Sequence, residues 1–179
     1  MKKILHLVLS LTIISAVCAA VLATVNAVTK DAIAQIKVRA KQNAAKLVMP
    51  KSVAKVEAVE ADGAEIYVGK NNAGKELAWA VVGKSAKGYG GDIVLMVGFT
   101  ADYSLITYQK LEAAETPGLG SNLTSPEFMK QFKGMPAAKD LAVTKDGGEV
   151  QAITSATITS RAVCDAINTA KNALQKVRK

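Results

Sequence analysis

The sequence predicts an α+β fold, in which an N-terminal transmembrane helix and a stalk helix precede a domain with a mainly antiparallel sheet flanked by helices. Three observations predict it. A long uncharged apolar run opens the chain, short strand-like runs separated by turn signals fill its middle, and an amphipathic helical pattern closes it. The expected division of the 179 residues is a membrane anchor at 1–29, a stalk helix at 30–50 and a domain at 51–179.

The anchor is predicted from residues 4–29, which contain no charged side chain. A helix of this length crosses a hydrocarbon core of about 30 Å. Lys2 and Lys3 precede the run, and positive residues at a short N-terminus tend to stay cytoplasmic. We therefore expect a single-pass protein of the cell inner (cytoplasmic) membrane with its C-terminal domain on the extracytoplasmic side. A cleaved signal peptide, with "VNA" at 25–27 as its cleavage site, is the alternative.

The stalk is predicted from the segment after Lys30, which is rich in Ala, Lys and Gln with apolar residues at helical spacing and is ended by Pro50. Beyond it the apolar period shortens to that of strands. Runs separated by Gly- and Asn-rich turn signals predict a meandering antiparallel sheet of four to five strands. These runs are "AEIYVG" at 64–69, "LAWAVVG" at 77–83, "DIVLMVGFT" at 92–100 and "SLITYQKLE" at 104–112.

Three further elements complete the expected domain. "SPEFMKQFKG" at 125–134 carries a Ser-Pro start signal for a short helix, and "KDGGE" at 145–149 predicts a hairpin before a strand "VQAI". The last helix is expected from Ser160 to about Lys176, with its N-terminus capped by the Ser160 hydroxyl. Its buried stripe is expected to consist of Val163, Ile167, Ala170, Leu174 and Val177.

The residue inventory excludes several kinds of chemistry for the domain. His6, the only histidine, lies in the anchor, so a Ser-His-Asp triad, a His-ligated metal and a His-ligated haem are excluded. Cys18 and Cys164 are too few for an iron–sulfur cluster, and we expect no metal ligands. The net charge is +8, but the basic residues are dispersed along the chain and aromatic residues are few. Nucleic-acid binding needs a concentrated basic surface, so no nucleic-acid partner is expected. Redox chemistry here would need a cofactor.

Three polar stretches remain as candidates for binding one. "KGYGGDI" at 87–93 and "ETPGLGSN" at 115–122 contain glycines that permit close approach to a ligand. "AITSATITSRAV" at 152–163 gathers five hydroxyls before a helix N-terminus, which is a favourable place for a phosphate. A Thr-rich strand that ends in a helix cap explains the same hydroxyls, and the residues alone leave both interpretations open.

In order and spacing, "GYGGDI", "ETPGLG" and "ITSATITSRAV" resemble the FMN-binding domain of the G subunit of the Rnf electron-transport complex and its relative, the C subunit of the sodium-pumping NADH:quinone reductase. The resemblance spans nearly the whole chain. That family carries FMN on a threonine of an [ST]-G-A-T motif through a phosphoester bond. Thr157 matches the modified threonine, whereas Ser155 replaces the usual Gly and Gln151 replaces an Asp. Ala113 also stands where the family often has His.

The resemblance implies an electron-transfer subunit of a membrane-bound ion-translocating ferredoxin:NAD oxidoreductase, an electron carrier rather than a catalyst on its own. It implies covalent FMN, other membrane subunits of the Rnf complex as partners, and a flavin transferase that uses FAD as the FMN donor. The implied cofactor-binding residues are Thr157, which carries FMN, with Thr154, Ser155, Ala156, Thr159, Ser160, Gly88, Tyr89, Gly90, Gly91, Glu115, Thr116, Gly118, Leu119 and Gly120.

Two other functions remain open from the sequence. A membrane-anchored non-redox adaptor would keep the fold without flavin, with Ser155 marking the loss of flavin attachment. A solute-binding or cell-surface adhesion module would keep the anchor and the sheet, and it would bind neither flavin nor a redox complex.

Overall fold

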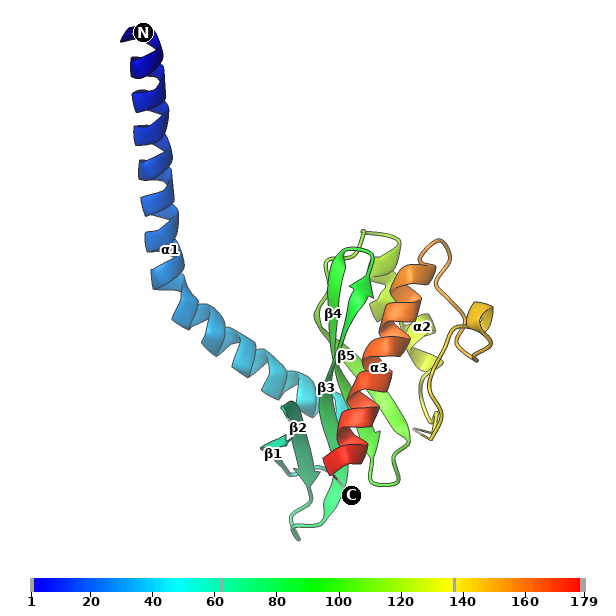
Figure 1. Cartoon of the computed structure of the whole chain (residues 1–179). Helices are drawn as coiled ribbons and strands as arrows, with labels where there is room; N and C mark the ends of the chain where they lie inside the picture. The colour runs from blue at the N-terminus through cyan, green and yellow to red at the C-terminus, as the bar shows by residue number, and fades with distance from the viewer. Residues whose placement is uncertain (1, 62, 137, 178–179) are drawn as a thin grey trace. The chain divides into compact units, whose positions relative to one another are not determined.

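The computed structural model describes residues 2–61, 63–136 and 138–177. The chain forms two compact units, Met1–Ala40 and Lys41–Lys179. Helix α1 (Lys2–Val48) makes up the first unit and contributes its last two turns to the second (Figure 1).

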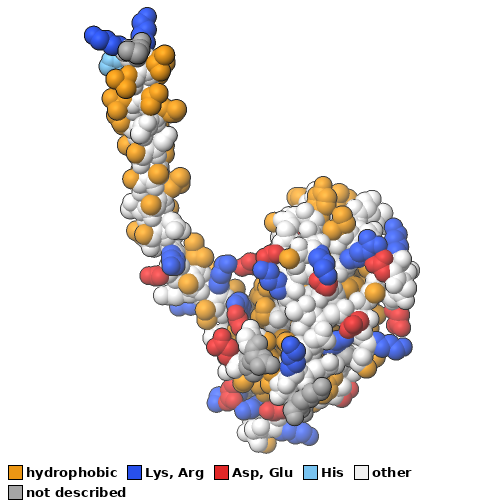
Figure 2. Space-filling model, in the orientation of Figure 1, with side chains coloured by type: hydrophobic (Ala, Val, Ile, Leu, Met, Phe, Trp, Pro, Cys, Tyr) orange, Lys and Arg blue, Asp and Glu red, His pale blue; other side chains and the backbone are white. Residues whose placement is uncertain are grey.

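Helix α1 has the length and composition of a membrane span, as the sequence predicts. Its most apolar 18-residue window has a mean hydropathy of 2.4, and hydrophobic side chains cover this part of the helix in Figure 2. Thr12, Thr24 and Thr29 each donate a hydrogen bond of 2.8 Å to the carbonyl four residues earlier. Because these hydroxyls are satisfied within the helix, they need no water partner in an apolar surrounding.

The second unit is built on a five-stranded antiparallel sheet in the order β1-β2-β3-β4-β5. The four predicted apolar runs form β2 to β5, and a charged edge strand is the fifth, so the predicted α+β class and meander are confirmed. The strands are β1 (Lys55–Ala61), β2 (Ala64–Lys70), β3 (Glu76–Gly88), β4 (Gly91–Thr100) and β5 (Leu105–Glu112).

Helix α3 (Thr157–Val177) covers one face of the sheet and crosses β3 and β4 (Figure 1). The predicted stripe of Val163, Ile167, Ala170 and Leu174 is buried in the main core, confirming the helix's orientation, and Val177 packs at its margin. Its partners include Val81, Leu95, Val97 and Phe99 from the sheet. The core therefore fixes where the first turn of α3 lies.

The opposite face of the sheet is covered by residues 41–49. Ala44, Ala45, Val48 and Met49 are buried against side chains of β2, β3 and β4. Lys41 Nζ also binds Glu65 Oε1 of β2 at 2.5 Å. Residues that the sequence assigns to the stalk thus form one layer of the domain.

The connections after β5 differ in part from expectation. The short helix is confirmed as α2 (Pro126–Lys130), and the Ser125 hydroxyl caps it by accepting a hydrogen bond from the Phe128 N–H at 3.3 Å. The predicted hairpin at 145–149 is wrong. Val143 and Val150 form an isolated parallel bridge around the 3-10 turn Thr144–Asp146. The expected strand at 150–153 is irregular beyond Val150, because the side chains of Gln131 and Ser160 bond the backbones of Gln151 and Ile153.

The start of the last helix is also different. Helix α3 begins at Thr157, so Ser160 lies inside its first turn rather than at the N-cap. The Ser160 backbone N–H donates to the Ala156 carbonyl at 3.0 Å, which is an intrahelical bond. A turn at Thr154 and Ser155 places the helix start three residues earlier than the capping pattern predicts.

Candidate functional site

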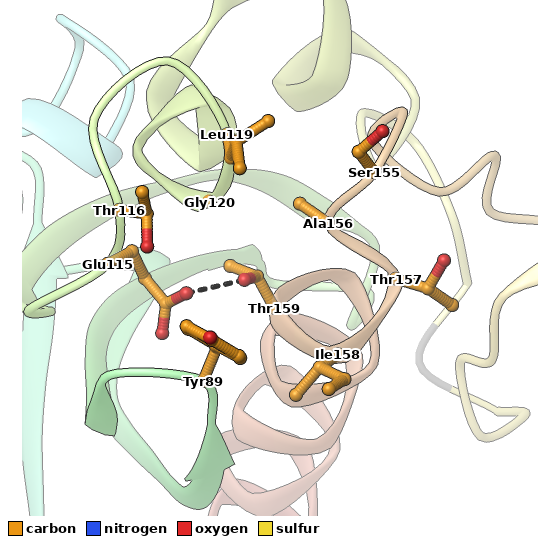
Figure 3. A pocket seen from close by; sticks show the side chains of 10 residues that line it. All are labelled: Tyr89, Glu115, Thr116, Leu119, Gly120, Ser155, Ala156, Thr157, Ile158 and Thr159. Atoms are coloured by element: carbon orange, nitrogen blue, oxygen red, sulfur yellow. Dashed lines mark hydrogen bonds between the residues drawn. The ribbon is translucent and has the colours of Figure 1, made fainter.

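The three polar stretches meet at one pocket of about 460 Å³ at the N-terminal end of α3 (Figure 3). The β3–β4 hairpin supplies one wall, the loop after β5 supplies a second, and the first turn of α3 supplies the third. The pocket is lined by Tyr89, Glu115, Thr116, Leu119, Gly120, Ser155, Ala156, Thr157, Ile158 and Thr159.

Glu115 connects the three stretches through its carboxylate. Oε1 accepts a hydrogen bond from the Gly90 N–H at 3.1 Å, and Oε2 accepts one from the Thr159 hydroxyl at 2.5 Å. The second bond is the dashed line in Figure 3. These partners lie 25 and 44 residues from Glu115 in the chain, so tertiary folding alone brings them together.

The glycines of the first two stretches allow close packing of protein atoms at this point. A Cβ at Gly90 would overlap the Ala114 carbonyl oxygen. One at Gly88 would lie 2.8 Å from Glu115 Oε1, and one at Gly120 would overlap Glu115 Oε2. The backbones of these glycines therefore approach the carboxylate and its loop.

The five hydroxyls divide into two groups. Thr159 and Ser160 are buried and used by the fold, because Thr159 donates to Glu115 and Ser160 joins the Ile153 N–H, at 2.9 Å, to the Ala156 carbonyl, at 3.0 Å. Within the described residues, the side chains of Thr154, Ser155 and Thr157 make no hydrogen bond. Ser155 and Thr157 are the two of these that line the pocket.

Ser155 adopts a left-handed backbone conformation with φ 61°. This region favours glycine, and an L residue there costs about 1–2 kcal/mol. Ser155 thus adopts the conformation that the glycine of the [ST]-G-A-T motif would adopt more easily. The turn leads into α3, where Thr157 is the first helical residue.

The remaining predicted site residues are placed around the pocket without lining it. Gly91 and Gly118 have φ values of 114° and 75° and form the turns of their loops. Thr154 faces a neighbouring polar hollow of about 610 Å³ that shares Leu119 and Ser155 with the pocket.

Sequence reasoning missed Ile158. Its side chain is 49% exposed and forms part of an apolar rim with Tyr89 and Leu119, which are 71% and 42% exposed. An apolar residue between two threonines at the start of a helix, where a solvated position is expected, was the signal available in the sequence.

Two titratable side chains of α3 follow its first turn in the sequence. Arg161 binds both carboxylate oxygens of Asp146 at 2.7 Å, and this bond holds the pKa of Asp146 below its ordinary value. Burial raises the pKa of the Cys164 thiol to about 12, so it stays neutral and is not a nucleophile at physiological pH. The polar groups among the side chains that line the pocket are hydroxyls and one carboxylate.

Comparison with known proteins identifies the family. The FMN-binding domain family matches residues 88–172, which contain the motifs "GYGGDI", "ETPGLG" and "ITSATITSRAV". The chain is 36% identical over 177 residues to the G subunit of the ion-translocating oxidoreductase complex of Methanosarcina acetivorans, covering 94% of this chain and 93% of the relative. It is 34% identical over 199 residues to the G subunit of the Na(+)-translocating ferredoxin:NAD(+) oxidoreductase complex of Acetobacterium woodii, covering 99% and 95%.

A solved structure shares the fold. The crystal structure of Shewanella oneidensis NqrC is similar with a TM-score of 0.51 and 23% identity, and the match covers 76% of this chain and 74% of that one. The chain belongs to the family of G subunits of the ion-translocating Rnf electron-transport complexes and contains that family's FMN-binding domain.

Proposed function

We propose that this protein is the electron-transfer subunit of a membrane-bound ion-translocating ferredoxin:NAD oxidoreductase complex and carries FMN in a phosphoester bond to Thr157. The observation that supports Thr157 most strongly is the division of the hydroxyls. Thr159 and Ser160 are occupied by the fold, whereas Thr157, the first residue of α3, lines the pocket and its hydroxyl makes no hydrogen bond to the described part of the chain. The Ser155 hydroxyl also makes no hydrogen bond to the described residues. Thr157 is the better candidate of the two because it occupies the position of the modified threonine in the [ST]-G-A-T pattern.

The pocket suits FMN in size and chemistry. Its volume of about 460 Å³ lies within the range of about 300–1,000 Å³ typical of cofactor sites. The apolar rim of Tyr89, Leu119 and Ile158 matches a flat aromatic ring system. The first backbone N–H groups of α3 have no partner within the helix, and they are suited to hold a phosphate beside Thr157. When bound, FMN supplies one- and two-electron transfer.

Attachment requires an external enzyme in this proposal. A threonine hydroxyl is a weak nucleophile without a base, and the only histidine of the chain is His6 in α1. A flavin transferase would remove the Thr157 proton, form the bond from Oγ1 to the FMN phosphorus of FAD, and release AMP as the pyrophosphate bond breaks. Mg²⁺ would neutralise the pyrophosphate.

The same proposal places the domain outside the cytoplasm, with the electron partners among the other membrane subunits of the complex. The uncharged run after Lys2 and Lys3 supports this orientation. A covalent bond keeps the flavin on the protein where free FMN is scarce. A protease added to cells whose outer membrane or cell wall has been made permeable should digest the domain. A domain that stays undigested while the cytoplasmic membrane is intact would contradict this orientation.

Fluorescence in a denaturing gel tests the assignment of the flavin. Full-length protein co-expressed with a flavin transferase should give a fluorescent band under ultraviolet light, because only a covalent flavin survives denaturation. Thr157→Ala should abolish the fluorescence, and the matched control Thr169→Ala, which removes an exposed α3 hydroxyl outside the pocket, should retain it. A dark wild-type band beside an active transferase would reject flavin attachment and favour the non-redox adaptor, and fluorescence in Thr157→Ala would reject the residue.

A further inference from the structure

The carboxylate of Glu115 is surrounded by backbone and hydroxyl groups from all three stretches. Both oxygens act as acceptors, Oε1 from the Gly90 N–H and Oε2 from the Thr159 hydroxyl. A carboxyl group that only accepts hydrogen bonds has the pattern of the ionised form. The pocket thus has a carboxylate in its wall, and within the described residues it forms no salt bridge to a Lys or Arg.

The space for this carboxylate depends on glycine. A side chain at Gly88 would crowd Oε1, and one at Gly120 would crowd Oε2 and the Thr159 hydroxyl together. The absence of side chains at these two positions lets one carboxylate contact the β3–β4 hairpin, its own loop and α3. Glu115 therefore contacts all three walls of the pocket at once.

We propose that Glu115 is a positioning residue that locks the three pocket walls together and lowers the reduction potential of the bound flavin through its charge. The second part rests on the proposed function. Reduction adds negative charge to the flavin, and a carboxylate in the wall of a partly desolvated pocket repels that charge. The oxidised form is therefore stabilised relative to the reduced form.

Hydrogen exchange of the full-length protein without flavin tests the lock. Glu115→Ala removes the acceptor of the Gly90 N–H, so exchange at this amide should accelerate at least several-fold. Glu115→Gln can still accept from Gly90 through its amide oxygen and can donate to Thr159 through its amide nitrogen, so protection should persist. Unchanged Gly90 exchange in Glu115→Ala would overturn the lock.

The midpoint potential of the flavin-loaded protein tests the charge. Glu115→Gln should shift it to a more positive value, whereas Glu149→Gln, which removes an exposed carboxylate that does not line the pocket, should leave it unchanged. An unchanged potential in Glu115→Gln would overturn the charge effect. A wild-type protein without flavin would contradict the proposed function. The exchange measurement would still show whether Glu115 holds the three pocket walls together.

Discussion

Helix α3 begins in the pocket and ends in the core, and its two parts use their side chains differently. In the first turn, Thr157 and Ile158 line the pocket, whereas Thr159 and Ser160 bond to neighbouring segments. The following turns bury an apolar stripe against the sheet. The later turns thus hold the helix in place, and within the first turn Thr159 and Ser160 serve the fold while the Thr157 hydroxyl is left for another partner.

The largest expected effect lies in the core part of α3. Leu174 is fully buried, so Leu174→Ala should lower the free energy of unfolding by about 2–5 kcal/mol through lost burial and a residual cavity. Chemical denaturation of the domain measures this. Ile158→Ala is the matched control in the first turn, and the comparison fails if both substitutions destabilise the protein equally.

A second prediction concerns the hydroxyls within the first turn. Ser160→Ala leaves the Ile153 N–H without its acceptor and should reduce the free energy of unfolding by about 1–3 kcal/mol. Thr157→Ala removes no hydrogen bond and should leave this quantity nearly unchanged. Equal losses in the two variants, measured by thermal or urea unfolding, would show that the hydroxyls are not divided as the structure indicates.

Removing the backbone strain at Ser155, in the left-handed turn before α3, should increase stability by a smaller amount. Ser155→Gly places glycine at φ 61° and should raise the free energy of unfolding by about 0.5–1 kcal/mol, because the strain removed exceeds the entropy that glycine loses on folding. The same variant restores the [ST]-G-A-T pattern, so its rate of flavin attachment should equal or exceed that of the wild type. A destabilised Ser155→Gly protein would mean that the serine side chain stabilises the turn.

The smallest effect is expected at the ion pair on the exposed side of α3. Arg161 lowers the pKa of Asp146, so the pair stabilises the folded state above the ordinary Asp pKa of about 3.9, and this contribution is lost as the pH falls through the lowered value. Carboxyl resonances followed by NMR should show Asp146 titrating below that pKa. In Arg161→Gln the titration should return toward it, with Lys176→Gln as an unchanged control.

Much of the fold could be predicted because it follows from local patterns. The strands β2 to β5 have short apolar runs between turn residues, and the stripe on α3 has a helical period. The edge strand β1 was less distinct because its residues Lys55–Ala61 mix charged side chains with small apolar ones and contain no strongly apolar run. The helix start was misplaced because Ser160 has the chemistry of a cap while the left-handed turn at Ser155 has no signature in a non-glycine residue.

The sequence predicted which segments form the site, but it did not predict the contacts between their residues. The order and spacing of the three stretches, compared with the family, predicted that they belong to one site. Nine of the predicted residues line the pocket, and Ile158 is the tenth lining residue. The contacts of Glu115 could not be read from the sequence, because they join residues 25 and 44 positions apart. The close packing at Gly88 and Gly120 likewise depends on the folded positions of Glu115 and Thr159.

Peptide mapping after trypsin digestion tests directly whether Thr157 carries the flavin. Trypsin cleavage after Lys145 and Arg161 releases peptide 146–161, which contains all five hydroxyls. After co-expression with an active flavin transferase, we expect this peptide to gain the mass of FMN less one water, and we expect fragmentation to place the gain on Thr157. An unmodified peptide, or a flavin on Thr154 or Ser155, would contradict it.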